Sequence, residues 1–198
     1  MGMLFIHLKD RICKMQKICL SFSISFASVH FAVAQQFALE TTQGRVVINL
    51  QADTAPLHVE RIQILSRDEF YNNMPFHRVV PGFMVQTGDG QYGNGTGVSK
   101  YQNLPLELSS IAFKRGVVGM ARAQDPNSAN SQFFIMLADN FALNGKYTVV
   151  GQVVSGMQSI DSVRQGTDKV IRTEIAGPQP RISPGSGGTA CQRYPNLC

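Results

Sequence analysis

The feature of this chain that most restricts its fold is a series of short apolar stretches separated by turn-forming residues. Val46, Ile48 and Leu50 alternate with polar neighbours, which is the period-two pattern of a half-buried β-strand. An earlier apolar stretch begins at Phe37, and Thr42-Gln43-Gly44 lies between the two, so 37–50 is predicted to form a hairpin. The same reasoning predicts further strands at 76–80, 84–87, 117–121, 133–137, 148–154 and 170–175.

Two stretches instead have apolar residues at helical spacing. The first lies between Thr54, a predicted N-cap, and Asp68, and the second covers 157–163. In the first, the apolar positions are Leu57, Val59, Ile62 and Leu65. Many short strands with only two helices favour a mainly β fold, and we expect a closed antiparallel β-barrel capped by two α-helices. A chain of 198 residues can bury one substantial core, so we expect one domain, at 35–177.

Residues 1–34 have the layout of a secretory signal peptide. Basic residues precede an apolar, serine-dotted stretch from Ile18, and Ala32-Val33-Ala34 supplies the small residues that a signal peptidase needs. We expect cleavage between Ala34 and Gln35, and therefore a periplasmic or secreted protein. The alternative is a retained membrane anchor, but the apolar run is diluted by serines and is shorter than the ~20 residues of a spanning helix. Met15 is an alternative start that leaves the same mature chain.

Charge and cysteines after the signal argue against two other classes of protein. The signal holds four basic residues and one acidic residue, which leaves 14 basic against 12 acidic side chains in the rest. No basic run occurs among them, so nucleic-acid binding is not expected. Residues 178–198 are rich in Pro, Gly and Ser and are predicted to be a flexible tail, in which Cys191 and Cys198 could form a disulfide. Two cysteines without nearby histidines make a poor zinc site, so no metal is expected.

Two sequence features suggest other functions, but the residues around them do not support those functions. Gly88-Asp89-Gly90-Gln91-Tyr92-Gly93 matches the letters of a dinucleotide-binding loop, but glycines continue to position 97, where such a loop must open a helix. We interpret it as a surface loop with tight turns. A hydrolase triad would need His58 or His77, and no nucleophile-elbow pattern is present. We interpret His58 as an ordinary helix residue and His77 as a packed or hydrogen-bonded strand residue.

The most informative stretch is 76–90, which we predict to be two strands joined at Pro81-Gly82. Strand alternation would put Arg78 on the same face as Phe76 and Val80, while Met84 and Gln86 share a face on the return strand. An arginine among apolar neighbours is either packed along a barrel rim or held for a purpose. The residues of this stretch alone leave both interpretations open.

Several motifs of this region and of later ones resemble the cyclophilin family of peptidyl-prolyl cis-trans isomerases, in family order and at family spacing. They extend over most of the segment from Gln36 to about Gly177. The motifs are Phe76-His77-Arg78, Phe83-Met84 with Gln86, Gly116 to Ala121, Ser131-Gln132-Phe133-Phe134 and Leu143-Asn144-Gly145-Lys146-Tyr147. The resemblance implies an enzyme that accelerates rotation about X-Pro bonds without a cofactor, acting on proline-containing segments of folding exported proteins. We expect it to be a monomer.

The resemblance also implies the roles of individual residues. Arg78 is similar to the catalytic arginine, and Gln86 resembles the residue that binds the substrate backbone. A proline pocket is implied for Phe83, Met84, Phe134 and Leu143. Ala121, Arg122 and Gln132 match positions that line the groove for the residues before proline, and Tyr147 stands where many members have histidine.

Three departures from the best-known members bear on ligands. The chain has no Trp, and Ala142 occupies a position that is aromatic in many members and is associated with tight cyclosporin binding. We therefore expect weak inhibition by cyclosporin. Arg122 replaces a frequent asparagine, and Tyr147 replaces the histidine. Arg122 either favours acidic substrate segments or is a solvated surface side chain.

Overall fold

Within residues 35–177, which the structure describes, a computed structural model contains nine β-strands, two α-helices and one 3-10 turn. The strands are β1 Gln36–Thr41, β2 Gly44–Leu50, β3 Met74–Pro75, β4 Arg78–Val80, β5 Met84–Thr87, β6 Val117–Met120, β7 Phe133–Met136, β8 Val149–Ser155 and β9 Lys169–Ala176. The helices are α1 Pro56–Arg67 and α2 Met157–Asp161, and η1 covers Phe141–Leu143. The predicted signal peptide at 1–34 and the predicted tail at 178–198, with Cys191 and Cys198, lie outside the described residues.

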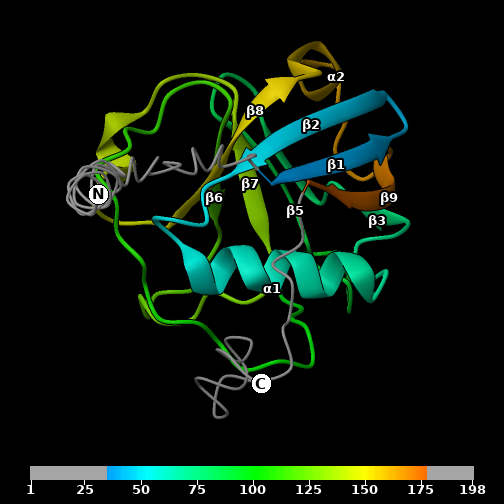
Figure 1. The fold of residues 1–198 in the computed structure, drawn as a ribbon. Coiled ribbons are helices and arrows are strands. Elements are labelled where there is room, and N and C mark those ends of the chain that lie inside the picture. The colour runs from blue at the N-terminus through cyan, green and yellow to red at the C-terminus, as the bar shows by residue number, and fades with distance from the viewer. Residues whose placement is uncertain (1–34, 178–198) are drawn as a thin grey trace, which may run out of the picture. The chain divides into compact units, whose positions relative to one another are not determined.

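All nine strands belong to one sheet in the order β3-β9-β1-β2-β8-β6-β7-β5-β4. Every pairing in it is antiparallel, and the sheet curls into a half-barrel (Figure 1). The prediction of a mainly β, antiparallel fold with two helices is therefore confirmed. The predicted closed barrel is not shown, because β3 and β4 form the two edges and no ladder joins them among the described strands.

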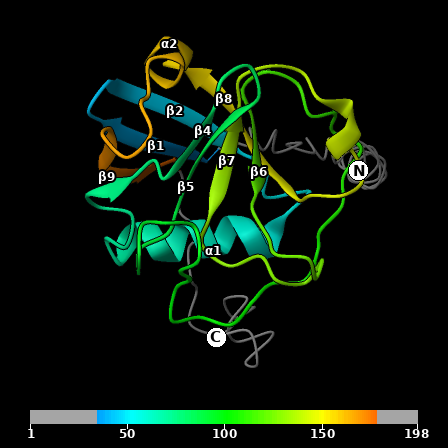
Figure 2. The same cartoon turned by 180° about the vertical axis from the view of Figure 1, so that it is seen from behind.

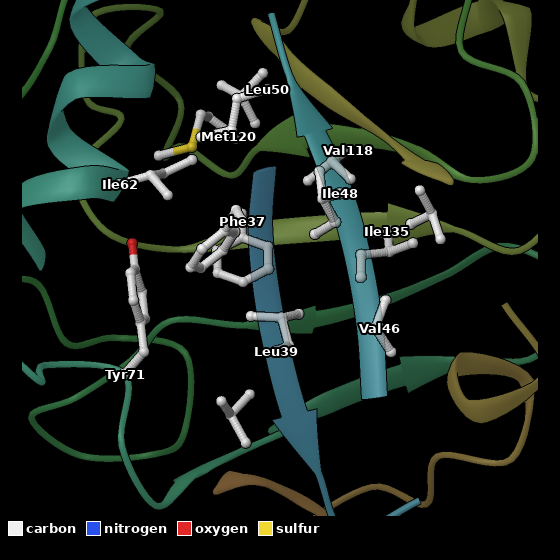
Figure 3. Close-up of a cluster of buried hydrophobic side chains, with 14 of the residues drawn as sticks. Phe37, Leu39, Val46, Ile48, Leu50, Ile62, Tyr71, Val118, Met120 and Ile135 are labelled. Carbon is white, nitrogen blue, oxygen red and sulfur yellow. The ribbon is translucent and has the colours of Figure 1, made fainter. Parts of the chain in front are cut away.

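A large apolar cluster, here called the main core, fills the space between the sheet and α1. Phe37 is central to it, with its ring centroid 5.9 Å from that of Tyr71 and 5.8 Å from that of Phe133. Figure 3 shows side chains of β1, β2 and α1 converging on these rings. The alternation of apolar and polar residues in β2 is the cause, because Val46, Ile48 and Leu50 all point inward and are buried.

The start of α1 corrects the predicted Thr54 cap. Ala55 is the N-cap, and the Thr54 hydroxyl donates instead to the carbonyl of Gln51. The free N–H groups of Leu57 and His58 donate to the carboxylate of Glu107, 3.2 and 3.1 Å away, which also lies 2.6 Å from His58 Nδ1. A carboxylate that is distant in sequence therefore accepts the hydrogen bonds that an N-cap side chain would otherwise accept.

The strand predicted at 76–80 begins only at Arg78, which corrects the faces assigned to its residues. The backbone N–H of Phe76 donates to Asp168 and its carbonyl accepts from Gly166, so the chain leaves the sheet between β3 and β4. Phe76 is 1% exposed in the main core, whereas Arg78 is exposed. The two residues do not share a face. The second predicted helix is also shorter, since α2 ends at Asp161.

Candidate active site

Three neighbouring strands place Arg78, Gln86 and Phe134 in one row. Gln86 of β5 is paired directly with Arg78 of β4 on one side and with Phe134 of β7 on the other. Figure 2 shows the three strands. Directly paired residues of antiparallel strands point to the same face of the sheet. Arg78 Nη1 donates to Gln86 Oε1 across 3.4 Å. The sheet register thus brings a guanidinium, an amide and an aromatic ring together.

A second apolar cluster, smaller than the main core, lies beside this row. Phe83, Leu143 and Tyr147 are its partly buried wall, and Met84 and Phe134 are buried within it. The Tyr147 ring meets Phe134 edge-on, with centroids 5.7 Å apart and planes at 87°. All the residues predicted to form an apolar pocket are therefore in one cluster, with an outer wall that is partly open to solvent.

Sequence reasoning missed two residues that shape this cluster. Phe113 stacks on Phe134 with ring centroids 5.8 Å apart. Gly119 is the partner of Phe134 on β6. This position requires glycine, because a Cβ there would lie 2.5 Å from Phe134 and 2.8 Å from Phe113. A glycine inside the apolar strand Val117–Met120 was the available signal, because such a glycine commonly marks close packing against its backbone.

Gln86 and Gln132, here called the amide pair, connect the row to a glycine-rich loop at 88–97. Gln86 Nε2 donates to Gln132 Oε1 across 2.8 Å. Gln132 Nε2 in turn donates to the carbonyls of Gly95 and Gly97, at 3.0 and 2.8 Å. Both amides are therefore held in defined orientations beside Arg78.

A cavity of about 240 Å³ is lined in part by the amide pair. Its wall combines the two glutamines with the loop and with the segment that follows β6. The lining residues are Gln86, Gly95, Thr96, Val98, Ala121, Arg122, Ala123, Ser128, Asn130 and Gln132. The three residues predicted to line a groove, Ala121, Arg122 and Gln132, all take part.

Arg122 is occupied by backbone carbonyls. Its Nε and Nη2 donate to the carbonyl of Lys146 at 3.1 and 3.0 Å, and its Nη1 donates to those of Ala123 and Gln124 at 2.9 and 3.3 Å. The guanidinium carbon lies 4.6 Å from the centre of the Tyr147 ring. The side chain thus ties the loop after β6 to the segment that carries Tyr147, which differs from a freely solvated arginine.

Two titratable side chains lie close in sequence to the row, since His77 directly precedes Arg78 and Asp89 follows Gln86 by three residues. Burial lowers the pKa of His77, the Asp89 carboxylate opposes that shift, and the Arg78 cation adds to it. Burial by itself raises the pKa of Asp89, but hydrogen bonds from backbone N–H groups, those of Tyr92 and Gly97 first, hold it well below its ordinary value. His77 is therefore neutral and Asp89 ionised at neutral pH.

Two other findings concern the surroundings of the site. Ala142 is exposed on η1, directly before Leu143 of the second cluster. Among residues 35–177, no group of His, Cys, Asp and Glu side chains could hold a metal ion. The helices in that same range are all too short or too polar to cross a bilayer.

Comparison with known proteins connects these residues to a family. The model of the family described as cyclophilin type peptidyl-prolyl cis-trans isomerase/CLD matches residues 36–182. A probable peptidyl-prolyl cis-trans isomerase of Brucella suis is 52% identical over 157 residues, covering 69% of this chain and 80% of that protein. A peptidyl-prolyl cis-trans isomerase of Acinetobacter baylyi is 35% identical over 142 residues, with 69% and 75% covered.

A solved structure shares the fold. The cyclophilin type peptidyl-prolyl cis-trans isomerase of Cryptosporidium parvum superposes with a TM-score of 0.66, at 24% identity, over 74% of this chain and 99% of that one. Another crystal structure of the same Cryptosporidium protein was determined in the presence of the dipeptide Ala-Pro, with a TM-score of 0.66.

Proposed function

The chain belongs to the cyclophilin family of peptidyl-prolyl cis-trans isomerases, and from that premise we propose that Arg78 is its catalytic residue and that the second cluster binds the substrate proline. The row of Arg78, Gln86 and Phe134 across three strands is the observation that carries the proposal. It puts a permanent cation at the edge of an apolar, partly open pocket.

The chemistry follows from the peptide bond. Resonance gives the C–N bond double-bond character and a rotation barrier of roughly 18–20 kcal/mol, and X-Pro bonds are those that populate both isomers. In the twisted transition state the prolyl nitrogen loses resonance and accepts a hydrogen bond better. A guanidinium at that nitrogen stabilises the twisted form more than either planar form, which is what catalysis requires. Arginine suits the role because it stays protonated and offers fixed donors.

The other site residues position the substrate. Phe83, Met84, Phe134 and Leu143 would hold the proline ring while the preceding carbonyl turns, and would exclude water from the Arg78 contact. Gln86 would hold the substrate backbone, since it lies between Arg78 and Phe134. The residues before proline would lie over the cavity lined by Ala121, Arg122 and Gln132. No covalent bond breaks, so the mechanism needs neither nucleophile nor cofactor.

Arg78→Ala tests this assignment. We expect turnover of a short Ala-Pro peptide, measured by NMR exchange, to fall at least about tenfold, with a smaller change in peptide affinity. Arg172→Ala is the matched control, because Arg172 is also an exposed strand arginine but lies on β9. Turnover that is unchanged in Arg78→Ala, with an intact circular dichroism spectrum, would remove Arg78 from the mechanism. A chain that binds the peptide without accelerating its exchange would be a binding module instead.

We further propose that the enzyme is exported and that it acts as a monomer on proline-containing segments of folding exported proteins, whose isomerisation takes tens of seconds without a catalyst. The support is the signal-like sequence of 1–34, and cleavage after Ala34 would leave all described strands in the mature chain. Mass spectrometry of protein expressed from the full gene in a bacterial host tests this. A mature species beginning at Gln35 in the periplasmic fraction is expected, and an uncleaved chain in the cytoplasm would contradict it.

A further inference from the structure

The carboxylate of Asp89 is surrounded by backbone N–H groups of the loop 88–97, here called the glycine loop. Asp89 is 1% exposed. Its Oδ1 accepts from Gln91 and Tyr92 at 3.1 and 2.9 Å, and its Oδ2 accepts from Asn94, Gly95 and Gly97 at 3.0, 2.7 and 3.1 Å. One buried side chain therefore fixes the path of most of the loop.

The glycines of this loop are the residues that make such wrapping possible. Gly93 and Gly95 have φ of +66° and +95°, a region that side chains disfavour. A Cβ on Gly97 would lie 2.0 Å from Asp89 Oδ1. The glycine spacing that matches a nucleotide-binding pattern in the sequence instead serves a carboxylate of the same chain.

The loop that Asp89 holds determines which way the amide pair faces. The Gly95 and Gly97 carbonyls can only accept, so Gln132 must turn its NH₂ group toward them and its oxygen toward Gln86. Gln86 then turns its own NH₂ group to Gln132 and its oxygen to Arg78. A guanidinium can only donate, so this is the orientation of Gln86 that Arg78 requires. A displaced loop would remove the constraint on both amides.

We propose that Asp89 is a positioning residue for the isomerase reaction: by holding the glycine loop it orients Gln132 and Gln86, and through them the guanidinium of Arg78. The same loop contributes Gly95, Thr96 and Val98 to the wall of the cavity. Asp89 itself is enclosed by the loop and acts only through it. This inference rests on the catalytic role proposed for Arg78.

Asp89→Asn tests the proposal, because the substitution keeps the size of the side chain but turns an amide donor toward N–H groups that need an acceptor. We expect kcat for a short Ala-Pro peptide to fall at least about tenfold. We also expect the side-chain amide signals of Gln86 and Gln132 to shift in ¹H–¹⁵N NMR spectra. A role limited to stability would lower the melting temperature without changing either quantity in the folded protein.

Asp168→Asn is the matched control. Asp168 is also a buried carboxylate that holds a loop, with bonds to Thr42, Gln43 and Arg164, none of which belongs to the amide pair. We expect this variant to lose stability while keeping wild-type kcat and wild-type amide signals. If Asp89→Asn does not fold, Asp89→Glu keeps a carboxylate but displaces it from the N–H groups by one methylene group, and kcat and the amide signals of that variant are judged by the same criterion.

The outcomes separate this inference from the assignment of Arg78. Full kcat in folded Asp89→Asn, or a loss of kcat with unshifted amide signals, overturns the positioning role while Arg78→Ala still shows its loss. An Arg78→Ala variant with wild-type turnover overturns the assignment of Arg78 whatever Asp89→Asn does.

Discussion

Two adjacent phenylalanines on β7 serve the two sides of the sheet. Phe133 belongs to the main core, where its ring lies 5.5 Å from Tyr71 and 5.8 Å from Phe37. Phe134 belongs to the second cluster, which ends in the partly buried Phe83, Leu143 and Tyr147. The same residue type therefore belongs to an enclosed core on one face and, in the proposed function, to the proline-binding surface on the other. An apolar wall left open to water is retained where it has a ligand to cover it.

Replacing each phenylalanine by alanine should affect stability and turnover in opposite ways, and these are the largest effects we expect. Phe133→Ala should lower the unfolding free energy by about 3–5 kcal/mol, because the cavity left by the removed ring would be enclosed on all sides. Turnover per folded molecule should not change. Phe134→Ala should cost less stability, because its cluster is partly open, but it should lower kcat/KM at least about tenfold by loosening the hold on proline.

Urea denaturation and NMR exchange measured on the same samples give both quantities. If Phe133→Ala does not fold, Phe133→Leu leaves a smaller cavity and serves instead. Equal losses of turnover in the two variants, each corrected for the folded fraction, would mean that the two faces are not functionally separate.

Arg122 tests the functional face further, because its guanidinium contacts Tyr147 of the second cluster. Arg122→Ala removes four hydrogen bonds to backbone carbonyls and the contact with Tyr147. We expect KM for a tetrapeptide to rise by about threefold to tenfold, with kcat nearly unchanged, because the groove before the proline loses its fixed edge. Arg122→Lys should behave like the alanine variant, since an ammonium cannot reproduce the planar fork.

The lysine variant also tests the other interpretation of Arg122. If its charge attracts acidic substrate segments, Arg122→Lys should keep the wild-type KM, and peptides with glutamate before proline should be preferred in a salt-dependent way. That result would contradict a clamp made of directed hydrogen bonds.

The sequence predicted what local patterning controls. Alternation in β2 and helical spacing in α1 are properties of neighbouring residues, and both elements are present. The predicted N-cap role of Thr54 was wrong, because the first N–H groups of α1 donate instead to the carboxylate of Glu107, which is distant in sequence. The strand predicted at 76–80 was wrong at its start, because the backbone of Phe76 bonds to Gly166 and Asp168, a contact that no local pattern contains.

The candidate site also has a part that the sequence predicted and a part that only the structure shows. Strand periodicity alone did not decide whether Arg78 packs along a barrel rim or has a functional role. The family motifs predicted the other residues of the candidate site. The structure adds that this set lies together, through the pairing of Gln86 with Arg78 and Phe134. The acceptors of Arg122 and the donors to Asp89 are backbone groups, so the sequence does not show which residues supply them, although the glycines at 93, 95 and 97 mark the loop that wraps Asp89.

The smallest effect we expect concerns His77, which lies in the chain between Phe76 of the main core and Arg78 of the site. Burial first, and the Arg78 cation in addition, lower the pKa of His77 in the folded protein, whereas the unfolded chain has the ordinary value of about 6.5. At a pH between the two values the unfolded state binds more protons, so the unfolding free energy rises with pH in that window. Acidification below about 6.5 should therefore destabilise the fold until the folded-state pKa is passed.

Denaturation midpoints of the wild type and of His77→Gln, measured from pH 8 down to about pH 5, isolate this contribution. Other groups titrate alike in both proteins, so the difference between the two curves belongs to His77. It should be constant above neutrality and should turn in favour of the glutamine variant as the pH falls. Parallel curves would mean that His77 accepts a proton equally well in both states.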